Sequence, residues 1–125
     1  MKRLPDTELE VMKALWASGG ASVTRADLEG RLRDLGWASN TVNTYLSRLC
    51  EKGFVSCEKR GKANWYAPLV SQADYLSFES SAVLDKVFGK SLKRFVASLA
   101  RGGDLDDAEV DELQRYLDEL KEGRK

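Results

Sequence analysis

The chain has 125 residues, no histidine, two cysteines and no net charge, since 20 Lys and Arg balance 20 Asp and Glu. This length suits one compact domain, or a small domain with an appendage. The lack of histidine removes the commonest general base, the usual catalytic triads and most zinc sites, and two cysteines are too few for a disulfide framework or a four-thiolate metal centre. We therefore expect a protein that is not an enzyme and that needs no metal and no cofactor.

Hydropathy and charge patterning indicate where the protein acts. No stretch approaches the roughly 18 consecutive apolar residues that a membrane span needs. The opening sequence MKRLPDTELE turns acidic where a signal peptide would turn apolar, so we expect a cytoplasmic protein without membrane insertion. Residues 1–68 carry a net charge of +3 and residues 69–125 a net charge of −3. A basic half before an acidic half hints at a head that binds a polyanion and a tail with another task.

Two helices are predicted in the first 36 residues. Thr7 with Glu10 has the pattern of a capping box and starts the first helix. Thr24 with Asp27 can cap the second, which Gly36 ends. Each helix has an apolar stripe at helical spacing, Leu9, Met12, Leu15 and Trp16 in the first and Leu28, Leu32 and Leu35 in the second.

A third helix is predicted over Ser39–Lys52, with Ser39 as its N-cap and Gly53 as its stop. Its apolar stripe consists of Val42, Leu46, Leu49 and Cys50. Outside that stripe, the first two turns hold mediocre helix formers, namely Asn40, Thr41, Asn43 and Thr44. Two helices joined by a short turn containing Gly, the second with a polar face, form the helix-turn-helix pattern.

Residues 54–69, FVSCEKRGKANWYAPL, predict a β-hairpin after the third helix. Two runs rich in β-branched and aromatic residues flank the charged turn Lys59–Lys62, and Pro68 closes the head. A hairpin in this place makes the unit a winged helix. We expect Trp65 and Tyr66 to pack the hairpin on the helices rather than to stack on bases. The two cysteines, Cys50 and Cys57, are interpreted as reduced thiols in preference to a redox switch.

The polar face of the third helix suits the reading of DNA. Asn, Thr and Ser side chains both donate and accept hydrogen bonds, and every base pair shows a distinct donor and acceptor pattern in the major groove. The N-terminal residues of a recognition helix are the ones that meet bases. The candidate DNA-binding residues are Ser39, Asn40, Thr41, Asn43, Thr44 and Arg48 on the helix, and Arg60 and Lys62 on the hairpin.

Two alternatives stay open in this region. Asn and Thr could cluster at the start of the helix only because N-terminal turns tolerate them as caps, although four of them beside a basic hairpin fit that explanation poorly. Trp37 either holds the preceding turn against the core or lies against the DNA backbone through its ring N–H.

The remainder of the chain reads as three helices. Ser71 can cap the first, Gly89 interrupts it, and Asp106 with Glu109 has the pattern of a further capping box. Their apolar stripes have no obvious core of their own. A segment of about 55 residues is also marginal for independent folding. We expect the stripes to be buried in a two-fold homodimer, the commonest oligomer, the alternative being that they fold back on the head.

The predicted fold is mainly α. A winged helix-turn-helix DNA-binding domain at residues 1–70 is followed by a three-helix C-terminal dimerisation region at residues 71–125. The candidate dimerisation residues are Leu84, Phe88, Phe95, Leu99, Leu113, Tyr116, Leu117 and Leu120.

The sequence resembles the penicillinase-repressor family of bacterial transcriptional regulators (BlaI/MecI/CopY type) nearly from end to end. The segment LPDTELEVMKALW resembles the family's first helix, and TVNTYLSRL with the following Lys52–Gly53 pair resembles its recognition helix. The hairpin EKRGKANWYAP resembles its wing. The resemblance implies a homodimer that binds a two-fold DNA site and represses transcription. It also implies that Thr41 and Thr44 contact bases, and that Arg48 and Lys62 hold the DNA backbone.

The resemblance further implies how the repressor could be released. In the β-lactam-responsive members, a membrane sensor protease triggers cleavage between an Asn and a Phe in the middle tail helix. The corresponding residues here are Ser98 and Leu99, which form the candidate cleavage site, and a membrane sensor protease is a candidate partner. The cysteine-rich C-terminal metal motif of the copper-responsive branch has no counterpart, since no Cys follows Cys57.

The sequence therefore predicts a sequence-specific transcriptional repressor that acts as a homodimer on a two-fold operator and is released by inactivation or cleavage of its tail. The alternative is a winged-helix protein–protein interaction module without specific DNA binding.

Overall fold

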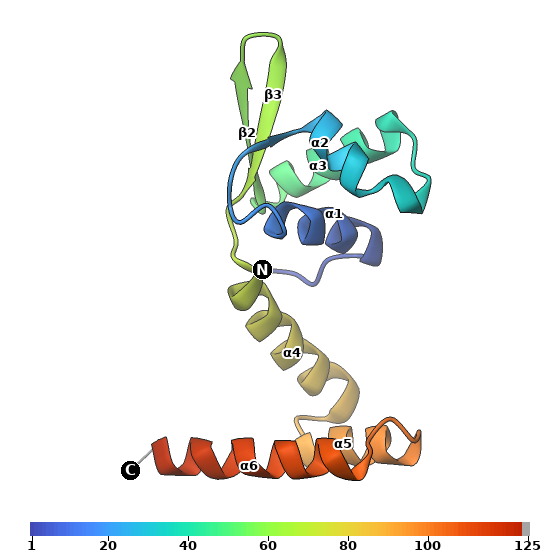
Figure 1. Cartoon of the computed structure of the whole chain (residues 1–125), viewed down its shortest axis with the longest axis vertical. Helices are drawn as coiled ribbons and strands as arrows, with labels where there is room; N and C mark the ends of the chain where they lie inside the picture. The colour runs from blue at the N-terminus through green and yellow to red at the C-terminus, as the bar shows by residue number, and fades with distance from the viewer. Residues whose placement is uncertain (124–125) are drawn as a thin grey trace. The chain divides into compact units, whose positions relative to one another are not determined.

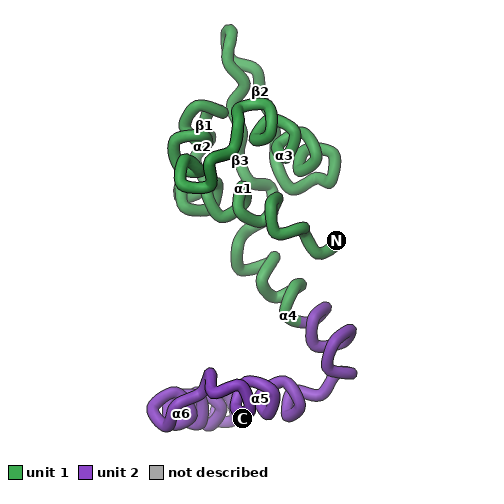
Figure 2. The backbone as a smooth tube through the Cα atoms, turned by 90° about the vertical axis from the view of Figure 1, so that its right-hand side faces the viewer, with its two compact units in different colours: residues 1–80 green, residues 81–125 purple. Residues whose placement is uncertain are grey.

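The computed structural model describes residues 1–123 and falls into two compact units, one of residues 1–80 and one that begins at Ser81 (Figure 2). The first unit contains α1 (Asp6–Trp16), β1 (Val23–Thr24), α2 (Arg25–Arg31), a 3-10 turn (Arg33–Leu35), α3 (Ser39–Glu51), β2 (Val55–Arg60) and β3 (Ala63–Pro68). Helix α4 (Gln72–Phe88) follows, and then α5 (Leu92–Arg101) and α6 (Asp107–Gly123) (Figure 1). This order confirms the predicted winged helix-turn-helix followed by three helices.

Helix α1 does not begin at the predicted capping box. It starts at Asp6 after Pro5, and no side chain caps it, so Thr7 already lies in the first turn. Pro5 brings a preset φ of −58° to the N-cap position, which lets the helix begin without a hydroxyl cap. Two acidic residues in the first turn, Asp6 and Glu8, add a favourable interaction with the helix dipole.

Helix α2 is capped as predicted and ends sooner than predicted. The Asp27 N–H donates to the Thr24 hydroxyl at 3.2 Å, and the Thr24 N–H donates back to the Asp27 carboxylate at 3.1 Å. After Arg31 the chain tightens into the 3-10 turn, which Gly36 ends at a φ of +68°. Tighter winding moves Leu35 off the face that Leu28 and Leu32 bury, so Leu35 is 43% exposed instead of joining their stripe.

Helix α3 confirms its predicted stripe and its stop. Val42, Leu46 and Leu49 are buried, and Gly53 takes a φ of +80° just after the C-cap. The predicted cap at Ser39 is wrong, because Ala38 is the N-cap and Ser39 is the first helical residue. The hydroxyl of Ser39 is therefore not tied to capping.

The wing is an antiparallel hairpin that also pairs with a short strand that the sequence did not indicate. The strand order is β1-β3-β2, with Val23 opposite Tyr66 and Val55 opposite Pro68. Only Gly61, at a φ of +64°, and Lys62 form the turn; the predicted turn residues Lys59 and Arg60 continue β2. A two-residue strand shows no alternation of apolar and polar residues, which is why β1 left no signal in the sequence.

The core of the first unit is built from α1, α2, α3, the sheet and the start of α4. Tyr75 of α4 is fully buried, and its hydroxyl accepts a hydrogen bond from the Leu4 N–H at 2.7 Å. Its ring lies 5.8 Å from that of Phe54 and 5.9 Å from that of Trp16, between centroids. The first unit thus extends through Ser80, beyond the domain boundary that the sequence placed after Val70.

A part-buried ion pair joins α1 to the C-terminal end of α3. Glu8 is only 2% exposed, and its carboxylate accepts a hydrogen bond from the Lys52 ammonium group. No sequence pattern indicates this pair, because Glu8 reads as an ordinary acidic residue of a first turn. The pair fixes α1 beside the helix that carries the candidate DNA-binding residues.

The helices of the second unit have well-defined ends. Gly89 and Lys90 take positive φ angles of 56° and 67° and end α4. The Ser91 hydroxyl then caps α5, accepting from the Arg94 N–H at 3.1 Å. The Glu109 N–H donates to the Asp106 carboxylate at 2.8 Å, which provides the N-cap bond of the predicted capping box.

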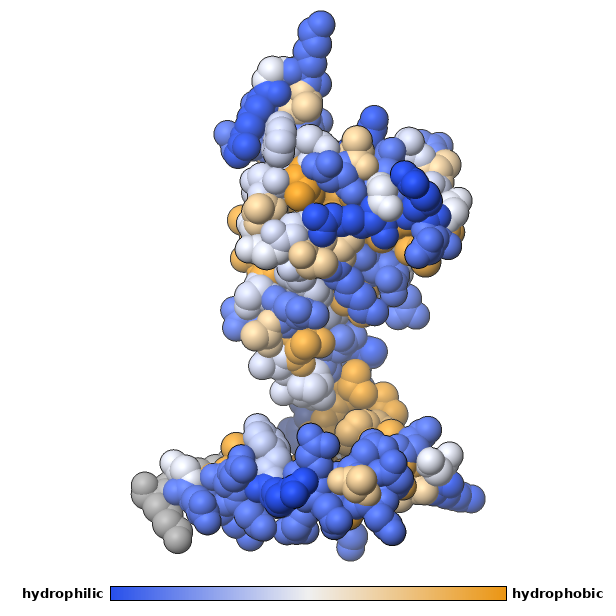
Figure 3. Space-filling model, in the orientation of Figure 1, coloured by the Kyte–Doolittle hydropathy of each residue, from blue (hydrophilic) through white to orange (hydrophobic). Residues whose placement is uncertain are grey.

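Apolar side chains of α5 and α6 stay at the surface of the second unit. None of the residues that the structure describes in α5 or α6 is buried, although the rings of Phe88 and Phe95 pack edge to face at 5.1 Å. The large exposed apolar residues of these two helices are Leu92, Val110, Leu113, Tyr116, Leu117 and Leu120. Figure 3 shows apolar side chains among charged ones on this unit.

Candidate nucleic-acid interface

The exposed side of α3 presents most of the candidate DNA-binding residues together. Ser39, Asn40, Asn43, Thr44 and Arg48 are all exposed, while Thr41 is half-buried. The buried stripe of the same helix faces α1 and the sheet, so these polar side chains lie on the side turned away from the core. The N-terminal turns of α3 therefore present amides and hydroxyls on one exposed face, where a ligand can reach them.

Thr44 has a defined orientation within this face. Its hydroxyl donates a hydrogen bond to the Asn40 carbonyl oxygen, one turn earlier, at 2.8 Å. The hydroxyl proton is therefore engaged, and the oxygen lone pairs and the methyl group remain available. Thr44 can accept a hydrogen bond from a base amino group or touch a thymine methyl.

An aromatic pair supports the middle of the helix. The Trp37 and Tyr45 rings meet edge to face, with centroids 5.1 Å apart, and both pack against the core. The Arg48 guanidinium lies over the Tyr45 ring at 5.8 Å from its centroid. Of the two alternatives for Trp37, this arrangement favours the one in which it holds the turn before α3 against the core.

The wing divides its cations between two environments. Arg60 is held by an ion pair with Glu58 at 3.0 Å and lies over the Trp65 ring at 5.1 Å from its centroid. In the strand register, Glu58 is opposite Trp65, on the face of the sheet away from Tyr66 and the helices. Trp65 is half-buried there and Tyr66 is buried against the core, so only Tyr66 packs the hairpin on the helices as expected. Lys62 is exposed in the turn.

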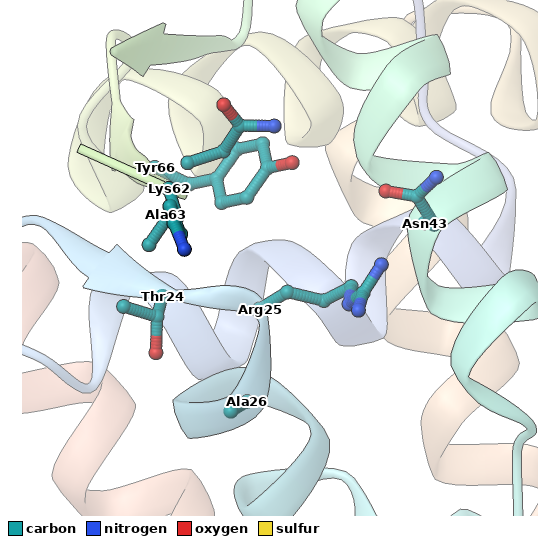
Figure 4. Close-up of a pocket in the computed structure, with 8 residues that line it drawn as sticks. Thr24, Arg25, Ala26, Asn43, Lys62, Ala63 and Tyr66 are labelled. Carbon is teal, nitrogen blue, oxygen red and sulfur yellow. The ribbon is translucent and has the colours of Figure 1, made fainter. Parts of the chain in front are cut away.

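A polar groove lies beside α3, between the start of α2 and the wing. Its volume is about 280 Å³, and it is lined by Thr24, Arg25, Ala26, Asn43, Lys62, Ala63, Asn64 and Tyr66. Figure 4 shows Arg25 extending from the start of α2 toward α3 and the amide of Asn43. Arg25 was not among the residues that the sequence suggested, because nothing in the sequence places the start of α2 opposite the hairpin turn.

The two cysteines differ in burial, since Cys50 is half-buried in α3 and Cys57 is exposed on β2. Cys50 and Cys57 are both free. Burial is the main cause that raises the pKa of the Cys50 thiol, and the neighbouring Cys57 raises it further. The raised pKa keeps the thiol in the protonated, weakly reactive form. Within residues 1–123, no cluster of three His, Cys, Asp or Glu side chains is placed to hold a metal ion.

The candidate dimerisation residues share one property: they are apolar and incompletely covered in the second unit. Leu84, Phe88, Phe95 and Leu99 are half-buried, and Leu113, Tyr116, Leu117 and Leu120 are exposed. An apolar hollow of about 500 Å³ between α5 and α6 is lined in part by Leu92, Val96, Val110, Leu113 and Leu117. The candidate cleavage site falls within α5, with Ser98 exposed and Leu99 half-buried.

Comparison of the sequence with known proteins identifies a family and several relatives. The family profile named penicillinase repressor matches residues 4–119. The penicillinase repressor of Bacillus licheniformis is 30% identical over 128 residues, covering 100% of this chain and 99% of that protein. The methicillin resistance regulatory protein MecI of Mammaliicoccus sciuri is 30% identical over 115 residues, covering 91% of this chain and 92% of that protein.

Two solved structures resemble part of this chain. The DNA-binding domain of the repressor BlaI aligns with a TM-score of 0.51 at 33% identity, over 60% of this chain and 94% of that one. Monomeric Bacillus licheniformis BlaI in complex with the blaP half-operator aligns with a TM-score of 0.50 at 32% identity, over 59% of this chain and 89% of that one.

Fold and relatives together define the class as winged helix-turn-helix regulators. Within this class, the chain belongs to the penicillinase repressor family. Among the described residues, no helix combines the length and the apolar character needed to cross a membrane.

Proposed function

We propose that this chain is a cytoplasmic transcriptional repressor that binds double-stranded DNA sequence-specifically as a homodimer on a two-fold operator. The observation that carries the proposal is the exposed polar face of α3, with Asn40, Asn43 and Thr44 in its N-terminal turns. The related repressor BlaI is solved in complex with a half-operator, and its structure aligns with 59% of this chain at 32% identity.

The proposal gives the candidate residues distinct tasks. Ser39, Asn40, Thr41, Asn43 and Thr44 meet base edges in the major groove, because amides read adenine and threonine methyls touch thymine. Arg48, Arg60 and Lys62 contact phosphates, which fix the register of the protein on the duplex without carrying sequence information. We assign these tasks to residues 1–70 and dimerisation to the helices that follow.

The dimer part of the proposal is supported by the surface of the second unit. Leu113 and Leu117, four residues apart on one face of α6, are 37% and 39% exposed, and exposed apolar surface is unfavourable in water. Burial of this stripe against a second copy would place two heads on one DNA molecule. The second head then binds at a high effective concentration, which can raise affinity by about 100-fold or more.

Release of the repressor is proposed to occur through the tail. Loss of the dimer removes the gain in effective concentration without any change to the residues that read DNA. Cleavage at Ser98–Leu99 by a membrane sensor protease or its effector would cut α5 and break up the apolar surface. Because a protease needs an extended substrate, this cleavage requires that the second half of α5 unwinds first.

The experiment that tests the proposal works without a known operator sequence. The full-length protein is used to retain fragments from a sheared library of its source genome at about 0.15 M salt, where binding through phosphates alone is suppressed. The proposal predicts enrichment of a two-fold sequence motif near promoters. If a folded protein enriches no sequence, specific DNA binding is wrong, and the alternative of a protein–protein interaction module takes its place.

A further inference from the structure

The polar groove beside α3 has a cation on each of two walls. Arg25 lines it from the start of α2, and Lys62 lines it from the turn of the wing. Among the residues that the structure describes, no carboxylate lines the groove, and its remaining polar groups are uncharged. A groove with two cations and no carboxylate among the described residues that line it suits an anion such as a phosphate group.

Arg25 lies beside a carboxylate of its own helix. Its Nε atom lies 3.3 Å from a carboxylate oxygen of Glu29, one turn later. This ion pair includes no hydrogen bond to that oxygen, so the N–H groups of the guanidinium remain available. A planar guanidinium presents its N–H groups as a fork, the geometry that binds two oxygens of a phosphate.

The uncharged groups of the groove can complete such a site. Asn43 of α3 and Asn64 of β3 each have an amide that donates hydrogen bonds. Tyr66 contributes a phenol. Burial is the main cause that raises the pKa of this phenol, and the neighbouring Cys57 raises it further, so the phenol keeps its proton at neutral pH. Hydrogen-bond donors from α2, α3 and the hairpin therefore surround one space.

We propose that this groove seats one backbone phosphate of the bound DNA, clamped between Arg25 and Lys62, and that Arg25 is thereby a positioning residue for α3. The proposal rests on the proposed function, since it needs a DNA ligand. A phosphate seated beside Asn43 fixes how far α3 can slide or turn in the major groove. Arg25 thus acts on base readout through position and not through a base contact.

The test compares three full-length variants, Arg25→Gln, Arg25→Lys and Arg31→Gln, with the unaltered protein. Each protein is titrated with a genomic fragment that the unaltered protein retains and with a mixed-sequence duplex of equal length, from about 50 to 200 mM salt. Arg31→Gln is the matched control, because Arg31 is an exposed arginine at the other end of α2 that does not line the groove. Circular dichroism confirms that each variant is folded.

A phosphate clamp predicts equal losses on both DNAs. For Arg25→Gln we expect the slope of log affinity against log salt to fall by about one for each head bound, with about fivefold weaker binding per head at 0.15 M salt. Arg25→Lys retains most of the slope because it keeps the charge. Arg31→Gln changes the slope by less than half as much.

Other outcomes overturn the proposal in distinguishable ways. If Arg25→Gln weakens only the specific complex, Arg25 reads a base and the groove is not a phosphate seat. If Arg25→Gln leaves the slope unchanged while the unaltered protein binds DNA normally, the groove stays empty in the complex and the proposed function stands. If the unaltered protein binds neither DNA, the proposed function itself fails and takes this inference with it.

Discussion

Thr44 donates its hydroxyl proton within its own helix, so it presents a methyl group and oxygen lone pairs to the outside. Thr44→Ala removes both groups and should weaken specific binding by about 1–3 kcal/mol while leaving binding to mixed-sequence DNA nearly unchanged. Thr44→Ser keeps the oxygen and removes the methyl, which separates a hydrogen bond to a base from contact with a thymine. Titrations of both variants with the two DNAs provide the measurement.

The internal hydrogen bond of Thr44 also defines the control. Alanine has a higher helix propensity than threonine, so Thr44→Ala should not unfold α3, and its melting temperature should stay near that of the unaltered protein. Equal weakening on both DNAs would show that Thr44 contributes to general affinity only. In that case Thr44 does not read a base.

At the residue scale, the sequence predicted which side chains of α3 are polar and exposed better than it predicted where the helices begin and which residues meet in space. The exposed amides and hydroxyls of α3 could be predicted because polar residues between buried ones at helical spacing must face outward. The caps at Thr7 and Ser39 failed because Pro5 and Ala38 set those helix ends by backbone geometry alone. Arg25 was missed because its partner in the groove, Lys62, is far away in the sequence.

At the element scale, Tyr75 ties the beginning of α4 to the N-terminal segment. Its hydroxyl accepts the Leu4 N–H, and the whole side chain is buried. Burial is the main cause that raises the pKa of the Tyr75 phenol, while the hydrogen bond from Leu4 lowers it to a smaller extent. The folded state therefore keeps the phenol proton at pH values where the unfolded chain has lost it.

This pKa difference predicts how stability depends on alkaline pH. The contribution of Tyr75 is fully present below its unfolded pKa of about 10, and the free energy of unfolding falls as pH rises through the folded pKa. Tyr75→Phe should cost about 1–2 kcal/mol at pH 8, because the Leu4 N–H loses its acceptor. Tyr75→Phe should also lose stability less steeply above pH 10.

Denaturant unfolding followed by tryptophan fluorescence measures this effect in the first unit, because all three tryptophans, at positions 16, 37 and 65, belong to it. The other tyrosines are present in both proteins, so their titration cancels in the comparison. Parallel pH profiles for the two proteins would show that Tyr75 does not carry the alkaline loss.

Element identities could be predicted more completely than the contacts between elements. Helices α1 to α6 and the hairpin each left a periodic pattern or a turn signal in the sequence. Strand β1 was missed because two residues carry no period, and the 3-10 turn at Arg33–Leu35 was missed because its apolar residue continues the spacing of α2. The pairing of Glu8 with Lys52 was missed because a buried carboxylate looks like a surface one until its partner is known.

At the scale of the whole molecule, the sequence indicates two tasks in two parts of the chain. The first unit buries a core around α1, α3 and the sheet, and leaves one polar face of α3 uncovered. In the second unit, α5 and α6 leave their apolar stripes exposed. The exposed stripes are the feature that supports the proposed homodimer, and they could be predicted from the helical spacing of the apolar residues.

The central claim is that two copies of this chain read one two-fold DNA site. The measurement that tests it most directly is sedimentation of the full-length protein with a retained genomic fragment and with a scrambled duplex of the same composition. The variant Leu117→Asp, which puts a charge into the exposed stripe of α6, is measured in parallel. Arg115→Asp, on the opposite side of the same helix, is its control.

We predict two chains on the retained fragment, with affinity at least about 1000-fold higher than for the scrambled duplex at physiological salt. Leu117→Asp should sediment as a monomer and bind the same fragment about 100-fold more weakly, while Arg115→Asp should behave like the unaltered protein. Equal affinity of the unaltered protein for both duplexes, or a single chain on the retained fragment, would contradict the claim.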